Sequence, residues 1–131
     1  MKKKLQSIKS LETKIWKECV RIIRARYPHV CVSCGREVEG KNMHCGHYFR
    51  KKFIPLRTRY LLDNLRIQCS YCNLRLHGNL ENYTVYLLKE KHFNIVSFAK
   101  LISQEKLKEY SVQEEREYLQ ELLEEYKAID N

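Results

Sequence analysis

Two pairs of cysteines are the residues whose type and spacing most clearly indicate chemistry in this chain. Cys31 and Cys34 are separated by two residues, and the same spacing separates Cys69 from Cys72. One turn of backbone can supply two thiolates at this spacing, and four thiolates satisfy the tetrahedral coordination of zinc. Because such a site is coordinatively closed, we expect a structural Zn²⁺ that stabilises the fold and takes no part in a reaction.

The remaining cysteines, Cys19 and Cys45, have no partner at that spacing. Cys19 lies among the apolar positions of a predicted helix and is interpreted as a small buried hydrophobe. Cys45 could displace one of the four ligands, and the sequence leaves its role open. In the reducing compartment that we expect for this chain, C-x-x-C pairs favour metal binding over disulfide bonds.

The stretch HCGHYFRKK, residues 44–52, places two histidines three residues apart in front of a basic run. It can form a zinc site, a catalytic site or a polar stretch that happens to contain histidines. Because the four cysteines outside it supply a full zinc ligand set, His47 is free for proton transfer. An imidazole, with an ordinary pKa of about 6.5, is suited to that task.

Asparagines and a further histidine flank the second cysteine pair. Asn64 precedes the strand that leads into this pair, and Asn73 directly follows Cys72. Asn73 and His77 are four residues apart, which places both on one face of a short predicted helix. A simpler interpretation also exists, because Asn64 suits a turn and the other two residues can decorate a helix end.

The order of His47, Asn64, Asn73 and His77 around a four-cysteine frame resembles the HNH, or ββα-metal, nuclease motif. The segments CVSCG, GHYFR and RYLLDNLRIQCSYCNLRLHGN, with the preceding LETKIWKECVRIIRARYP, resemble the NinG (Rap) recombination proteins of lambdoid phages over roughly residues 10–86. That family comprises structure-specific endonucleases that act on branched DNA such as Holliday junctions. The resemblance implies a small zinc-stabilised treble-clef core that hydrolyses DNA phosphodiester bonds in phage recombination.

The resemblance also implies a role for each matching residue. His47 matches the general base that activates water, and Asn64 matches the residue that holds the loop carrying this base. Asn73 matches a ligand of a catalytic Mg²⁺ or Mn²⁺, and His77 lies where some family members place another. Such a metal would stabilise charge on the phosphate and on the leaving oxygen.

One position departs from the family pattern. Many HNH enzymes place Asp or His directly before the base as a metal ligand, but that position is Gly46 in this chain. His44 can replace this ligand if the strand bends at Gly46. In a straight strand, residues 44 and 47 face opposite sides.

Charge is unevenly distributed along the chain, whose net charge is +9. Residues 1–80 hold 18 Lys and Arg against 5 Asp and Glu, whereas residues 81–131 hold 7 against 11. DNA, branched or duplex, is the expected partner of the basic half, although a solvated basic surface also explains the charge. A zinc-stabilised nucleic-acid-binding module without catalysis is the alternative function. The candidate phosphate contacts are Arg50, Lys51, Lys52, Arg57 and Arg59.

The elements that must position these residues predict an α+β fold. Apolar residues at helical spacing predict an N-terminal helix over about 5–26, which Pro28 ends. A short strand through 43–48 and a second strand entering the second cysteine pair follow. A short helix is expected from Ser70 to Gly78, with the glycine just past its end.

Helices dominate the last third of the sequence. The spacing predicts helices over about 80–91 and 95–102, and Ser111 with Glu114 forms a capping box for a final helix. The apolar stripe of that helix packs on the rest of the chain or meets a second copy, in a homodimer. We expect residues 1–80 to form the nuclease-like core and residues 81–131 a helical extension.

We expect neither a signal peptide nor a membrane-spanning segment in this sequence. The basic start lacks the apolar region of a signal peptide, and no apolar run approaches the roughly 18 residues needed to cross a bilayer. We therefore expect no membrane partner and a location in the cytoplasm of a bacterial or phage-infected cell.

Overall fold

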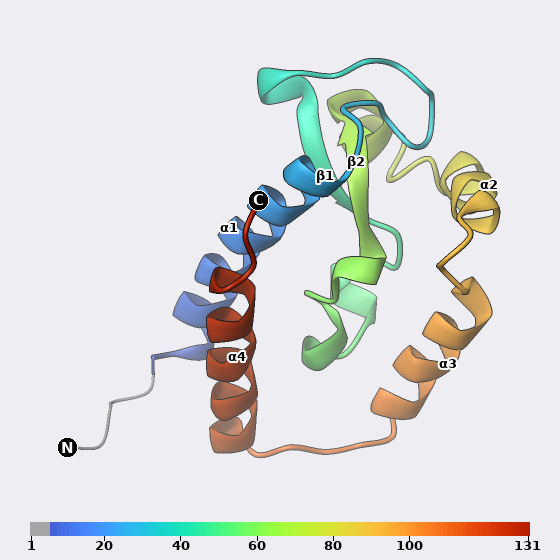
Figure 1. Cartoon of the computed structure of the whole chain (residues 1–131). Helices are drawn as coiled ribbons and strands as arrows, with labels where there is room; N and C mark the ends of the chain where they lie inside the picture. Colours follow the sequence, from blue (N-terminus) through green and yellow to red (C-terminus); the bar gives the residue numbers. More distant parts are fainter. Residues whose placement is uncertain (1–5) are drawn as a thin grey trace.

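The computed structural model describes residues 6–131 as a mixed α+β fold, with helices on both sides of a two-stranded sheet (Figure 1). Its main elements are α1 (Ile8–Arg26), β1 (Met43–His47), β2 (Leu65–Cys69), α2 (Leu80–Lys89), α3 (Ile95–Glu105) and α4 (Val112–Lys127). Short 3₁₀ turns precede β1 and connect it to β2, and a wide turn, Tyr71–Arg75, follows β2. None of the described helices has the length and apolar character needed to cross a membrane.

The first helix agrees with the predicted one in its body and its end. It begins at Ile8 because the Ser7 side chain accepts a hydrogen bond from the Ser10 N–H, at 3.2 Å. It ends at Arg26, shortly before Pro28. The predicted start at residue 5 lies outside the described residues.

The two strands are antiparallel and regularly paired. Met43 lies opposite Cys69, and His47 lies opposite Leu65, with one residue opposite one residue throughout. The strand therefore does not bulge at Gly46. β2 is buried along its whole length, which fixes the strand rigidly beneath the residues that surround it.

The final helix, α4, packs beside α1 (Figure 1). Its predicted capping box is present, with Ser111 accepting from the Glu114 N–H and Glu114 accepting from the Ser111 N–H. The apolar stripe of α4 forms one core with α1 and β2 that includes Leu11, Ile15, Ile67, Leu119 and Leu123. Of the two roles expected for this stripe, the structure shows packing within the chain, and a homodimer stays a prediction.

The predicted helix from Ser70 to Gly78 is wrong in its extent. The chain forms only the wide turn Tyr71–Arg75, after which His77, Gly78 and Asn79 all have positive φ angles, of 51°, 101° and 45°. Three successive residues in this region cannot continue a right-handed helix. Asn73 and His77 therefore do not share a helix face.

Candidate functional site

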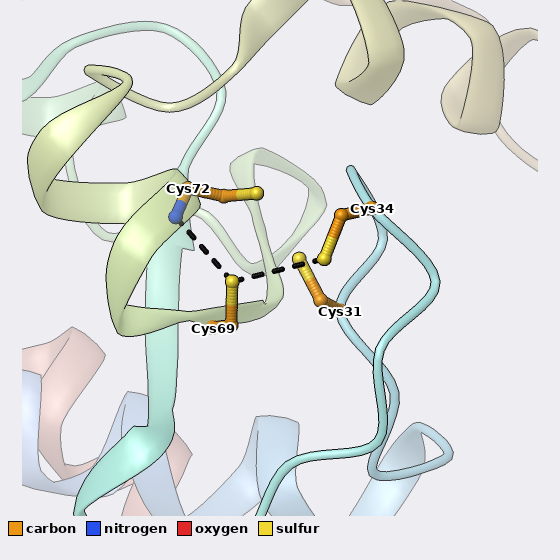
Figure 2. Close-up of side chains that lie close together, drawn as sticks. All are labelled: Cys31, Cys34, Cys69 and Cys72. Carbon is orange, nitrogen blue, oxygen red and sulfur yellow. Dashed lines mark hydrogen bonds between the residues drawn. The ribbon is translucent and has the colours of Figure 1, made fainter.

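The four predicted zinc ligands converge (Figure 2). The sulfur atoms of Cys31, Cys34, Cys69 and Cys72 all lie within 4.8 Å of one another, and those of Cys34 and Cys69 are 3.8 Å apart. Tetrahedral zinc with Zn–S distances of about 2.3 Å requires S–S separations of about 3.8 Å. The donor set and its spacing could therefore hold a structural zinc ion.

Local structure brings these thiols together. The first pair lies in a turn where the Gly35 N–H donates to the Cys31 carbonyl at 2.9 Å, and Gly35 adopts a φ of 79° that suits glycine. β2 ends at Cys69, whose sulfur accepts from the Cys72 N–H at 3.3 Å. The side chain of Asn79 donates to the Cys72 sulfur at 3.5 Å. Such donors stabilise thiolate ligands.

The other two cysteines lie away from this cluster. Cys19 belongs to the core beneath α1, and Cys45 packs against the same core. Burial raises the pKa of Cys19 to about 12 and raises that of Cys45 as well. Both thiols lie outside the cluster and stay protonated, so neither can replace one of the four thiolate ligands. The alternative of Cys45 as a zinc ligand is therefore wrong.

A basic cavity of about 510 Å³ opens where β1 ends. It brings together His47, Asn73, His77 and four of the five candidate phosphate contacts, although they come from three separate segments. None of its described lining residues is Asp or Glu. The residues that line the basic cavity are His47, Arg50, Lys51, Lys52, Arg59, Asn73, His77 and Gly78.

His47 is held in one orientation inside this cavity. Its Nε2 lies 3.1 Å from the backbone carbonyl of Arg59, and a carbonyl can only accept, so Nε2 carries the proton and Nδ1 keeps a lone pair. The ring stacks on Trp16 of α1, with centroids 5.0 Å apart and planes 10° apart. No spacing pattern in the sequence indicated Trp16, because its contact with His47 joins distant segments.

The environment of His47 keeps its imidazole neutral at pH 7. Burial lowers its pKa to about 4, with a contribution from the positive charge of Lys51, although the hydrogen bond to the Arg59 carbonyl acts in the opposite direction. The free Nδ1 lone pair can therefore accept a proton from a water molecule or hydroxyl group in the basic cavity.

Asn64 holds the backbone directly after His47. Its Oδ1 accepts from the Phe49 N–H at 2.8 Å, and its Nδ2 donates to the Phe49 carbonyl at 3.0 Å. Its own carbonyl accepts from the Tyr48 N–H at 2.9 Å. Asn64 is buried and does not line the basic cavity, so it acts on the site through the backbone that it fixes.

His44 is not placed as a ligand in the basic cavity. The bend at Gly46 that this role requires is absent, so His44 and His47 face opposite sides of β1. Instead, the His44 Nδ1 accepts a hydrogen bond from the Asn73 side-chain NH₂ at 3.0 Å. Asn73 is thereby oriented with its Oδ1 still available, while His77 lines the basic cavity independently.

Close packing explains why position 46 carries no side chain. A Cβ atom on Gly46 would lie 1.9 Å from Oε1 of Gln68, which is fully buried. The Gln68 NH₂ group is fixed by hydrogen bonds to the Gly78 carbonyl, at 2.6 Å, and to the Ser33 hydroxyl, at 2.9 Å. A metal ligand at position 46 is therefore incompatible with this arrangement.

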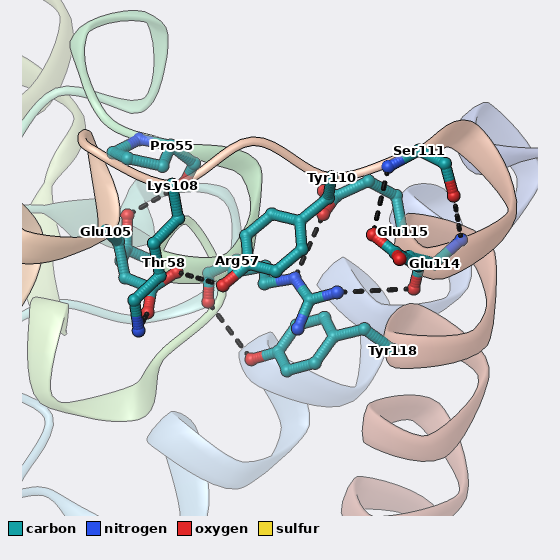
Figure 3. A network of polar contacts seen from close by, with 10 residues as sticks. All are labelled: Pro55, Arg57, Thr58, Glu105, Lys108, Tyr110, Ser111, Glu114, Glu115 and Tyr118. Carbon is teal, nitrogen blue, oxygen red and sulfur yellow. Dashed lines mark hydrogen bonds and ion pairs between the residues drawn. The ribbon is translucent and has the colours of Figure 1, made fainter.

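Arg57 was a candidate phosphate contact, and the structure places it elsewhere (Figure 3). Its Nε forms an ion pair with Glu115 at 2.9 Å, and its guanidinium lies 3.5 Å from the centroid of the Tyr110 ring and 4.6 Å from that of Tyr118. These contacts join the start of α4 to the loop before β2. Because its charge is paired outside the basic cavity, we exclude Arg57 from the phosphate contacts.

Comparison with known families gives one result. The family model described as NinG, Bacteriophage Lambda NinG protein, matches residues 1–131. The match includes the C-terminal helices, which lie beyond the segment that resembles this family by motif. Neither a curated protein nor a solved structure matches the chain significantly.

Proposed function

The chain belongs to the bacteriophage lambda NinG family, and from this membership we propose that it is a metal-dependent DNA endonuclease of the HNH type in phage recombination. The observation that carries the proposal is the basic cavity, where a neutral histidine with a free ring nitrogen lies among four cationic side chains. We assign the turn that carries Cys31 and Cys34, the β1–β2 hairpin and the turn Tyr71–Arg75 to a treble-clef core. Branched DNA is the proposed substrate.

In this proposal His47 is the general base. Its Nδ1 takes a proton from the water that attacks the scissile phosphorus, while the Arg59 carbonyl holds the proton on Nε2. Trp16 and Asn64 fix the ring plane and the backbone around it. The negative charge of a bound phosphate raises the His47 pKa from about 4 toward the working pH, which improves proton transfer.

The cationic residues bind the DNA backbone. Arg50, Lys51 and Lys52 are exposed at the mouth of the basic cavity, while Arg59 is held by an ion pair with Glu12 at 3.4 Å. Cations at this position attract phosphate groups and make binding depend strongly on salt.

Asn73 and His77 are the residues that would hold a catalytic divalent cation. They offer an amide oxygen and an imidazole, with no carboxylate among the described lining residues. This donor set fits Mn²⁺ better than Mg²⁺, which is usually bound through carboxylates. When bound, the cation supplies stabilisation of charge on the phosphate and on the leaving 3′-oxygen.

The missing carboxylate also supports the second candidate function, a zinc-stabilised nucleic-acid-binding module without catalysis. The same four cations would bind phosphate groups in that case. His47 would then serve only to pack against Trp16.

A cleavage assay separates the two functions. The zinc-loaded protein is incubated with a four-way junction, a flap and a linear duplex, with Mn²⁺, with Mg²⁺ or with neither. We expect branched substrates to be cut fastest with Mn²⁺, leaving 3′-hydroxyl and 5′-phosphate ends. His47→Gln should slow cleavage by about 10²–10⁴-fold without weakening binding.

The matched control is His29→Gln, since His29 does not line the basic cavity and its ring nitrogen is hydrogen-bonded to the Arg24 carbonyl. This variant should cut like the wild type. If the wild type binds all three substrates and cuts none under any condition, the endonuclease proposal fails and the binding module remains.

A further inference from the structure

A second pocket, of about 330 Å³, adjoins the basic cavity, and Arg50 lines both. This aromatic pocket lies between the loop after β1 and the helix α3. Its walls include the rings of Tyr48, Phe49 and Phe53, and Ile102 of α3 adds an aliphatic surface. Lys106 and Arg50 contribute cationic groups to the same pocket.

The walls of the aromatic pocket differ in how firmly they are held. The Tyr48 ring is fixed by a hydrogen bond between its hydroxyl and that of Thr84, at 2.6 Å. The Phe49 ring packs edge-on against Tyr48, with centroids 4.9 Å apart, and also packs against Phe98, with centroids 6.0 Å apart. Phe53, in contrast, is 61% exposed, and the Lys52 ammonium group lies 5.1 Å from the centroid of its ring. An exposed ring beside two fixed rings offers a planar ligand a face on which to stack.

The apolar walls and the nearby cationic side chains together indicate which kind of ligand the aromatic pocket can bind. An apolar, aromatic interior suits an uncharged planar group, whereas Arg50, Lys52 and Lys106 suit an anion attached to it. Any nucleobase can stack on an aromatic side chain, because every base has a flat π-face. The phosphate of the same nucleotide is joined to the base through the sugar and lies close to it. A single nucleotide with its phosphate in the basic cavity satisfies both requirements.

We propose that the aromatic pocket receives one unstacked nucleobase of the DNA strand whose phosphate lies in the basic cavity. This inference rests on the proposed function and adds a source of selectivity to it. A base in a continuous duplex is stacked and paired, and moving it out of the helix costs free energy that an unpaired base does not require. The pocket therefore favours strands with unpaired bases, as found where DNA branches.

The pocket is tested by binding, without cleavage. Zinc-loaded protein, in buffer with no added divalent metal and no chelator, is titrated against a fluorescent oligothymidine strand and against an abasic strand of equal length. The abasic strand keeps every phosphate and lacks every base. One stacked base should make the oligothymidine bind about 5- to 150-fold more tightly, the equivalent of about 1–3 kcal/mol.

Two substitutions assign this preference to the pocket. Phe53→Ala should bring the affinity ratio close to one while leaving the affinity for the abasic strand unchanged. Ser103→Trp, which places a large ring in the lining, should do the same. The matched control is Leu88→Ala, because Leu88 is 66% exposed and lines neither the basic cavity nor the aromatic pocket.

The outcomes distinguish this inference from the proposed function. Equal wild-type affinity for the two strands, or a Phe53→Ala variant that weakens both equally, overturns the base pocket and leaves the endonuclease proposal intact. Failure to bind either strand also overturns the base pocket, while the endonuclease proposal is decided by its own cleavage assay on branched and duplex DNA. A base preference that Phe53→Ala and Ser103→Trp remove supports the pocket even if no substrate is ever cut.

Discussion

The two ends of the β1–β2 hairpin are built in opposite ways. At one end Met43 pairs with Cys69, and four thiols face one another in a cluster that leaves no position for a further ligand. At the other end His47 pairs with Leu65, and the basic cavity opens to solvent beside exposed cations. The difference teaches that one short sheet carries a closed cluster suited to a structural metal at one end and an open, basic cavity suited to binding a ligand at the other.

A buried side chain connects these two ends. Gln68, near the zinc end of β2, donates to Ser33 in the first cysteine turn and to the carbonyl of Gly78 at the basic cavity. The four-cysteine cluster is therefore joined to a part of the cavity wall through Gln68. Substitutions among the four cysteines should therefore disrupt both the fold and the basic cavity, whereas substitutions at the cavity end should disrupt the cavity alone.

Loss of the zinc ligands should have the largest effect. Structural zinc contributes about 10 kcal/mol or more to the folding of small domains. We expect Cys69→Ser, or removal of zinc by a chelator, to abolish the cooperative thermal transition and most of the helical circular dichroism. Cys19→Ala, a buried thiol outside the cluster, should keep both. A zinc-free chain with native circular dichroism would contradict the claim that the four-cysteine end of the hairpin stabilises the fold.

A methyl group at Gly46 should have the next largest effect, because this position links the two ends. Its Cβ would collide with Gln68 Oε1, and overpacking of this kind costs about 1–3 kcal/mol. Urea denaturation of Gly46→Ala measures the loss. In a Gln68→Ala background the same substitution should cost much less, because the colliding atom is gone. Equal costs in both backgrounds would show that another contact is responsible.

An effect of comparable size is expected from the charge state of His47. Its pKa is about 4 in the folded chain and about 6.5 when unfolded, so the unfolded chain binds more protons between these values. Stability should therefore fall as the pH decreases from about 6.5 to about 4. His47→Gln should lose less stability over this interval, as measured by urea midpoints at several pH values. An identical pH dependence in both proteins would contradict the burial of a neutral imidazole.

Local spacing was sufficient to predict the zinc end but only part of the cavity end. Cysteine pairs within single turns constrain the chain locally, and both strands follow from the residues beside them. Arg57 and Arg59 show the limit, because they are two residues apart and the sequence treats them alike. Arg57 is removed from the cavity by Glu115, which lies 58 residues further along the chain. No local pattern indicates such a partner.

The extent of the turn after Cys72 was missed for a related reason. His77 and Asn79 adopt positive φ angles that their residue types adopt only occasionally, and a sequence pattern cannot identify where this occurs. The packing of Gln68 against Gly46 was equally hidden. The departure at Gly46 from the family pattern was visible in the sequence, but its physical cause required the structure.

The smallest expected effects come from single arginines in residues 50–59, between β1 and β2. Arg50 lines the basic cavity and Arg57 is paired with Glu115, so the two substitutions should affect different properties. Arg50→Gln should leave the free energy of unfolding unchanged and reduce the slope of log affinity against log salt by about 1, because it removes one phosphate contact. Arg57→Gln should leave that slope unchanged and lower stability by about 1 kcal/mol, through its ion pair and ring contacts. Reversed results would mean that Arg57 leaves Glu115 to contact phosphate, and that Arg50 instead contributes to stability.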